Sequence, residues 1–162
     1  MELSAARPAG PADVAAIVAL VNEAYRVEEF FIRGPRTGPR EVEEKLHTGG
    51  FLVAEGPRGL EGCVYVEPRG DSGYFGLLAV DPSRQGTGLG RRLTGAAEER
   101  LRAAGCRSVE ILVVHLRAEL TSFYARLGYE EAGTAPFPEA ERPRLRLPCH
   151  FVVMRKPLGP PG

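Results

Sequence analysis

A strand, a glycine-rich loop, a helix and a second strand follow one another between residues 72 and 114, and this succession most constrains the fold. The apolar run "SGYFGLLAV" (72–80) leads through "DPSRQGTGLG" (81–90) into a predicted helix over 88–104 and the strand "SVEILVV" (108–114). One side of that helix is apolar, and Gly105 is placed to end it. Two strands joined through a helix are expected to be parallel neighbours in one sheet.

The sequence on either side adds helices and antiparallel strands. Helical spacing of apolar residues predicts a helix over residues 11–25, a second begins at Pro39 and runs to about His47, and a third covers 117–128. Turn-forming residues separate apolar runs at 51–56, 60–68 and 72–80, which is typical of an antiparallel meander. Short strands are expected at 1–7, 129–135 and 150–158.

The predicted order is therefore β-α-α-β-β-β-α-β-α-β-β, an α/β fold with a mixed, predominantly antiparallel sheet flanked by helices. We expect a single domain over residues 1–157 and a short flexible tail over 158–162. The connection over 136–149 holds four prolines and has no clear periodicity, so it is either a functional loop or a solvated one.

Charge and composition exclude several classes of protein. The 162 residues carry 21 Lys and Arg against 21 Asp and Glu, and this balance argues against nucleic acid or an anionic membrane as the main partner. No apolar run approaches the roughly 20 residues of a membrane span, and "MELSAARPAG" has no signal-peptide core, so a cytoplasmic location is expected. Cys63, Cys106 and Cys149 are widely separated, and no metal site is predicted.

The glycine-rich loop is placed to bind an anion. Unpaired N–H groups at a helix N-terminus attract phosphate, and glycines allow the phosphate to approach the main chain. The loop lacks the Gly-Lys-Ser/Thr of a Walker A sequence. Its spacing is G-x-G-x-G rather than the G-x-G-x-x-G of dinucleotide-binding proteins, and no suitable acidic residue follows.

One known pattern does fit both this loop and a later segment. Gln85-x-x-Gly88-x-Gly90 follows "LLAVDP" and resembles the pyrophosphate loop of the GNAT N-acetyltransferase superfamily, Arg/Gln-x-x-Gly-x-Gly/Ala. "FYARLGY" (123–129) resembles the Phe-Tyr-x-x-x-Gly-Phe/Tyr signature of the same superfamily, at the expected distance. With the matching element order, the resemblance covers about residues 4–157.

The resemblance implies an acetyl-CoA site on a bulged strand that splays from its neighbour. Leu78 and Val80 would pair through their backbone with pantetheine, and Gln85 would open the loop. The pyrophosphate would lie on the main chain of the loop, whose predicted cofactor-binding residues are Gly86, Thr87, Gly88, Leu89, Gly90 and Arg91. Acetyl-CoA would act as co-substrate, without a metal.

Tyr124 matches the tyrosine that acts as general acid in many members. The leaving thiolate, with a free-thiol pKa of about 8.5, benefits from a proton donor. Tyr124 also shares helical spacing with Leu120, Phe123 and Leu127, so a purely structural role in the core stays open.

The general base is less evident, because the strand before the loop has no glutamate. Glu110 on the next strand is a candidate, although alternation can point it away from the cleft. The other candidates are Glu28, Glu29, His115 and a water chain. Arg117 stands where relatives often carry an asparagine that contacts the cofactor, and a contact to phosphate is one role open to it.

The expected function is transfer of acetyl from acetyl-CoA to a primary amine by direct attack in a ternary complex. The alternatives are a non-catalytic acyl-CoA sensor domain and an enzyme that uses a longer acyl group. The acceptor is expected to be a small-molecule or peptide amine, with no nucleic-acid or membrane partner. A homodimer stays open.

Overall fold

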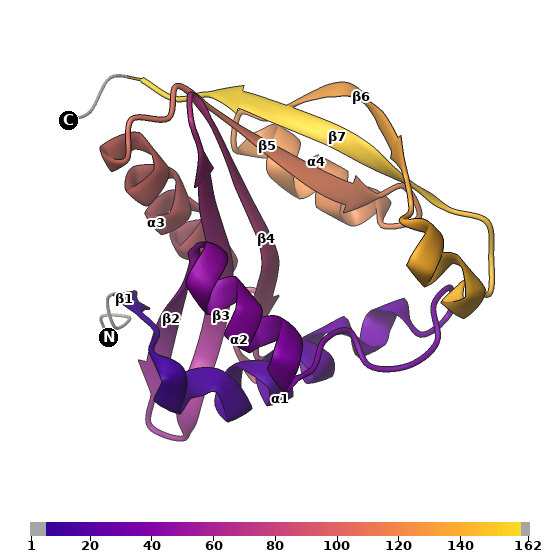
Figure 1. Cartoon of the computed structure of the whole chain (residues 1–162), viewed down its shortest axis with the longest axis horizontal. Coiled ribbons are helices and arrows are strands. Elements are labelled where there is room, and N and C mark those ends of the chain that lie inside the picture. Colours follow the sequence, from indigo (N-terminus) through magenta and orange to yellow (C-terminus); the bar gives the residue numbers. More distant parts are fainter. Residues whose placement is uncertain (1–5, 160–162) are drawn as a thin grey trace.

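A seven-stranded mixed sheet runs through the computed structural model, which describes residues 6–159 (Figure 1). The strand order is β1-β2-β3-β4-β5-β7-β6. The strands are β1 (Arg7–Pro8), β2 (Gly50–Gly56), β3 (Gly59–Arg69), β4 (Ser72–Val80), β5 (Ser108–Val114), β6 (Glu130–Pro136) and β7 (His150–Pro157). The α-helices are α1 (Val14–Ala24), α2 (Pro39–Thr48), α3 (Leu89–Ala103) and α4 (Ala118–Arg126). The 3-10 turns are η1 (Pro11–Asp13), η2 (Tyr25–Glu28), η3 (Pro82–Arg84) and η4 (Glu139–Arg144).

The predicted architecture is confirmed, including the crossover at its centre. β2, β3 and β4 form the antiparallel meander, and β4 pairs with β5 in parallel through α3. The helix predicted over 11–25 is divided, because 3-10 turns replace α-helix at Pro11–Asp13 and again from Tyr25 onward. Residues 1–5 of the predicted first strand lie outside the described residues, and β1 covers Arg7–Pro8.

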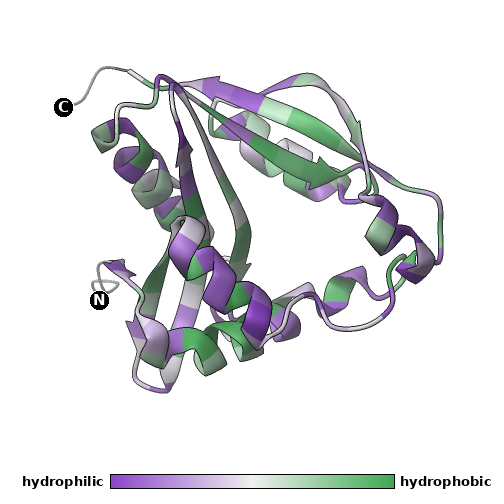
Figure 2. Ribbon diagram, in the orientation of Figure 1, coloured by the Kyte–Doolittle hydropathy of each residue, from purple (hydrophilic) through white to green (hydrophobic). Residues whose placement is uncertain are grey.

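The core has two layers, one on each face of the sheet. Helix α3 packs on β2, β3 and β4, and α4 packs on β5, over a buried cluster that includes Phe75, Leu93 and Leu101. Helix α1 packs on β3 and β4, and α2 on α1 and β2, over a second cluster that includes Ile17 and Phe51. Figure 2 shows hydrophobic residues concentrated in the central strands, with hydrophilic residues along the outer parts of the helices.

Strand β4 carries a bulge in its second half. Tyr65 of β3 pairs with Gly76, and Cys63 pairs with Ala79, so one residue of β3 faces two residues of β4. Within the bulge Leu77 has φ of +49°, the one positive φ of a non-glycine residue between residues 6 and 159. The bulge also reverses the faces of the strand, because Phe75 packs toward α3 whereas Leu77 and Ala79 pack toward α1.

Strands β4 and β5 separate soon after they meet. Their parallel pairing covers only Ser72–Tyr74 against residues 108–110, whereas β5 pairs with β7 along its whole length. Figure 1 shows the two strands diverging toward the end of β4 that leads into α3. The sheet therefore opens beside the bulge, as the resemblance implied.

Glu98 of α3 links this helix to Tyr129 and to Lys156 of β7. This buried carboxylate accepts a hydrogen bond of 2.7 Å from the Tyr129 hydroxyl and lies 3.1 Å from the Lys156 ammonium nitrogen.

We expect Glu98→Ala to lower the free energy of unfolding by about 2–3 kcal/mol, since it leaves buried polar partners unpaired. Urea denaturation measures this loss. The control is Glu99→Ala, which removes an exposed carboxylate paired with Arg102 and is expected to cost about 0.5 kcal/mol or less. Equal losses in the two variants would contradict the prediction.

Candidate active site

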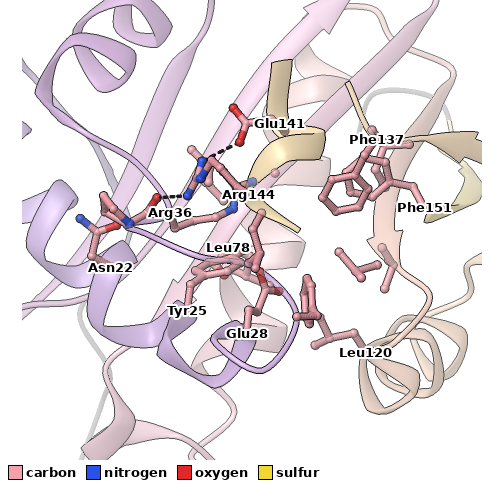
Figure 3. A pocket seen from close by; sticks show the side chains of 18 of the residues that line it. Asn22, Tyr25, Glu28, Arg36, Leu78, Leu120, Phe137, Glu141, Arg144 and Phe151 are labelled. Carbon is pink, nitrogen blue, oxygen red and sulfur yellow. Dashed lines mark hydrogen bonds and ion pairs between the residues drawn. The ribbon is translucent and has the colours of Figure 1, made fainter. Parts of the chain in front are cut away.

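A cleft of about 770 Å³ lies where β4 and β5 separate. Its walls come from the segment that follows α1, from the bulged part of β4, from β5 and α4, and from the connection between β6 and β7 (Figure 3). Figure 3 shows the side chains of Tyr25 and Glu28 on one side of the cleft and that of Leu120 of α4 on another. Tyr124 of α4 also lines the cleft. The cleft therefore gathers residues as far apart in the sequence as Ala19 and Phe151.

Leu78 lines this cleft, and a hydrogen bond holds its carbonyl. The Tyr25 hydroxyl donates a hydrogen bond of 3.1 Å to the Leu78 carbonyl. Burial raises the pKa of Tyr25, so its hydroxyl keeps the proton that this bond needs. Val80, two residues further on, is half-buried and packs against the core on the α3 side.

The glycine-rich loop follows directly and opens α3. Gly86 and Gly88 have φ of +81° and +88°, and no atom lies within 4 Å of the position that a Cβ would take at either residue. Gly88 is the N-cap of α3 and offers no side chain to the first N–H groups of the helix. The main chain here is therefore open to a ligand.

The other predicted loop residues lie around these two glycines. Gln85 and Arg91 are exposed, and the Thr87 hydroxyl donates a hydrogen bond of 2.5 Å to the Arg84 carbonyl. Leu89 is buried in the core. A Cβ at Gly90 would lie 3.8 Å from Val80 and 3.7 Å from Phe123, so the start of α3 adjoins the end of β4.

Tyr124 is a core residue that also borders the cleft. Its ring packs with the rings of Phe75, Phe123 and Tyr129, at centroid distances of 5.0 to 6.0 Å, and it is 6% exposed. Yet Tyr124 also lines the cleft, and within the described residues its hydroxyl has no hydrogen-bond partner. Burial, with the nearby Tyr25 and Tyr74, raises the pKa of Tyr124, so the phenol stays protonated at neutral pH.

The candidate bases separate clearly by position. Glu110 is exposed on β5, opposite Arg155 of β7, and does not line the cleft. His115 stacks on His150, with ring centroids 4.1 Å apart, and is also outside the cleft lining. Glu29 lines the cleft but is paired with Arg26 at 3.6 Å.

Glu28 is the buried carboxylate among these candidates. It is 6% exposed, lines the cleft, and lies 2.8 Å from the Arg117 guanidinium. Burial raises the pKa of Glu28, and the charges of Arg117 and Arg36 oppose this rise. Arg117 is thus engaged in ion pairs with Glu28 and with Glu119.

The segment after α1 and the connection between β6 and β7 meet across the cleft, which the sequence did not reveal. Ile32 bridges to Leu145, the Arg33 N–H donates to the Arg144 carbonyl at 2.8 Å, and the Arg146 N–H donates to the Phe31 carbonyl at 2.7 Å. Phe137 stacks on Phe151, and both belong to one hydrophobic cluster with Ile32 and Leu145. The aromatic residues of "VEEFF" (27–31) and "PFP" (136–138) were the features of the sequence that could have indicated this contact. No pattern in the sequence linked the two segments to each other.

Other kinds of site find little support in residues 6–159. No helix there is long and apolar enough to cross a membrane. The same residues contain no group of three or more His, Cys, Asp or Glu side chains that could hold a metal ion. The three cysteines are free thiols, two buried and one half-buried.

Known proteins resemble this chain in sequence. A family model described as "Acetyltransferase (GNAT) domain" matches residues 47–131, more than half of the chain. The mycothiol acetyltransferase of Actinosynnema mirum is 34% identical over 92 residues, which are 56% of this chain and 31% of that protein. A protein of Oryza sativa subsp. japonica named "Probable glucosamine 6-phosphate N-acetyltransferase 2" is 33% identical over 94 residues, 51% of this chain and 55% of that protein. The chain thus matches about a third to about half of the length of these relatives.

Solved structures share the fold along nearly the whole chain. The ribosomal-protein-S18-alanine N-acetyltransferase of Escherichia coli aligns with a TM-score of 0.77 at 17% identity, covering 97% of this chain and 95% of that one. A phosphinothricin acetyltransferase of Sinorhizobium meliloti, in complex with acetyl-CoA, aligns with a TM-score of 0.76 at 18% identity, covering 98% and 90%. The matched family model spans both the glycine-rich loop and "FYARLGY", and on this evidence the chain belongs to the GNAT acetyltransferase family.

Proposed function

We propose that this protein is an acetyl-CoA-dependent N-acetyltransferase that acts on a primary amine by direct attack in a ternary complex. The observation that carries the proposal is the opening of the sheet between β4 and β5. There Leu78 and Tyr124 line the same cleft. A thioester carbonyl held at Leu78 would be open to an amine that enters the cleft.

The residues that would hold acetyl-CoA follow the end of β4. The backbone of Leu78 and Val80 would bind the pantetheine arm. The N–H groups of Gly86, Gly88, Gly90 and Arg91 would bind the pyrophosphate, with Gln85 at the start of the loop and with Thr87 and Leu89 between the glycines. The open space at Gly86 and Gly88 fits this role, since nothing in the described residues fills the approach to the main chain.

Acetyl-CoA supplies the activated acetyl group, and side chains of this protein would move the protons. The amine nitrogen bonds to the carbonyl carbon, the carbon–sulfur bond breaks, and the Tyr124 hydroxyl donates its proton to the leaving sulfur. The raised pKa of Tyr124 keeps that proton available across the neutral range.

We favour Glu28 over Glu110 as the base that removes the proton from the amine. An alkylammonium has a pKa near 10.4, so a carboxylate with a raised pKa is better matched to it than an exposed one. Glu28 is buried in the cleft wall, whereas Glu110 is exposed outside it. The proton can pass directly or through a water molecule.

Two measurements on the purified protein test this proposal. Acetyl-CoA is expected to raise the melting temperature, and a panel of primary amines is expected to release the coenzyme A thiol between about pH 6 and about pH 9. Binding without thiol release for any amine would favour the sensor function instead. Competition between acetyl-CoA and longer acyl-CoA esters, measured side by side, tests the choice of acyl group.

A further inference from the structure

Arg36 stands on a segment that is fixed on both sides of it. The Arg144 guanidinium donates a hydrogen bond of 2.5 Å to the carbonyl of Pro35, just before Arg36. Just after it, Thr37 exchanges two hydrogen bonds with the Asn22 side chain, at 3.0 and 3.1 Å. The backbone of Arg36 is therefore positioned before any ligand arrives, which lowers the entropic cost of binding.

The Arg36 guanidinium reaches the wall of the cleft next to the proposed reaction centre. It lies over the Tyr25 ring, 5.3 Å from the centroid, and the hydroxyl of that ring is bonded to the Leu78 carbonyl. Figure 3 shows Arg36, Tyr25, Leu78 and Glu28 as neighbours around the cleft. A single aromatic ring thus separates this positive charge from the main chain at which we place the thioester.

The charges that line the cleft leave Arg36 without a carboxylate partner. Arg26 is paired with Glu23 and Glu29, and Arg144 with Glu141 at 2.6 Å. Within the described residues neither Arg36 nor Arg146, which also lines the cleft, has an acidic side chain within ion-pair distance. Two guanidinium groups are therefore available to an anionic ligand. Glu28 also lies near Arg36, whose charge opposes the rise in the pKa of Glu28 that burial causes.

Resting on the acetyl transfer proposed above, we infer that the acceptor is a small amino acid whose carboxylate is bound by Arg36, assisted by Arg146. A guanidinium matches a carboxylate in shape and charge through two parallel hydrogen bonds. Glu28 would meet the ammonium end of the same molecule. The bridge from Ile32 to Leu145 joins two of the segments that line the cleft and favours a small acceptor over a continuing polypeptide.

A matched panel of acceptors tests this inference on the wild-type protein. Each set holds an L-amino acid, its uncharged amide and the corresponding decarboxylated amine, together with a peptide amidated at its C-terminus. Thiol release from acetyl-CoA is the readout. We expect the preferred amino acid to have a kcat/KM at least about tenfold above those of its amide and its decarboxylated amine. A preference for the uncharged amines or the peptide would overturn the inference and leave the acetyltransferase function standing.

Two variants locate the carboxylate. Arg36→Gln is expected to raise the KM of the amino acid about tenfold or more and to leave the KM of its amide and the Kd of acetyl-CoA unchanged. The control Arg33→Gln removes the same charge from an exposed side chain of the same segment, outside the cleft lining, and is expected to change neither KM. Equal effects of Arg36→Gln on the amino acid and the amide would overturn the inference. Absence of thiol release with every amine would overturn the proposed function itself, and this inference with it.

Discussion

Replacing Gly88 with valine is expected to weaken acetyl-CoA binding about hundredfold or more. Gly88 has φ of +88° and is the N-cap of α3. A branched side chain is strained at this φ, and its bulk would stand in the open space through which we expect the pyrophosphate to reach the main chain. Losing two charge-assisted hydrogen bonds accounts for an effect of this size. Isothermal titration with acetyl-CoA measures the change in Kd.

The other end of the same helix offers a matched control. Gly105 has φ of +95°, and no atom lies within 4 Å of the position of an added Cβ there, as at Gly88. Gly105→Val should therefore cost a similar amount of stability, about 1–3 kcal/mol, and leave the Kd of acetyl-CoA unchanged. Wild-type affinity in the Gly88→Val variant, or an equal loss in both variants, would show that the loop is only a turn.

Replacing Tyr124 with phenylalanine is expected to lower kcat about hundredfold and to leave the Kd of acetyl-CoA within about threefold of the wild type. The substitution keeps the ring that packs against Phe75 and Tyr129. It removes a hydroxyl that has no hydrogen-bond partner within the described residues, so stability should hardly change. Steady-state kinetics with a saturating amine give the effect on kcat.

The pH dependence of the wild-type rate gives an independent check on Tyr124. A phenol donates its proton only below its pKa, and burial raises that of Tyr124 above the ordinary value of about 10. The wild-type kcat should therefore show no falling limb from this group up to about pH 10. A fall at lower pH would argue against the phenol as acid.

Tyr65→Phe provides the control for the loss of a tyrosine hydroxyl. Tyr65 is buried on β3, its hydroxyl donates to Glu67 at 2.6 Å, and it does not line the cleft. This variant is expected to keep the wild-type kcat. If Tyr124→Phe also kept the wild-type rate and pH profile, Tyr124 would be a core residue only.

Local features of the sequence were sufficient for the architecture. The apolar periodicity of α3, the glycines before it and Gly105 after it all agree on one strand–helix–strand unit, and β4 and β5 are parallel as expected. The secondary structure of a segment can be predicted without its tertiary contacts when its apolar periodicity, helix caps and turn residues all indicate the same structure. The family could be identified for a related reason, since its two motifs lie in continuous segments.

The candidate base illustrates why the residues of a site are harder to predict from a sequence than the architecture is. Glu110 and Glu28 were both candidates, and only the assembled sheet shows the first exposed outside the cleft and the second buried within it. Burial depends on which segments pack over a residue, and for Glu28 these include Arg117, which is 89 positions away. Sequence spacing carries no information about such a pair.

The sequence on its own specified the order of the elements, the glycine-rich loop and the tyrosine that follows it, because each depends on residues close together in the chain. Tertiary structure decided the rest. Strict alternation would place Phe75, Leu77 and Ala79 on one face of β4, but the bulge at Leu77 turns Leu77 and Ala79 to the other face. Pairing with β3 creates that bulge, and the contact between Ile32 and Leu145 joins two segments that line the cleft, so these features exist only once distant segments have met.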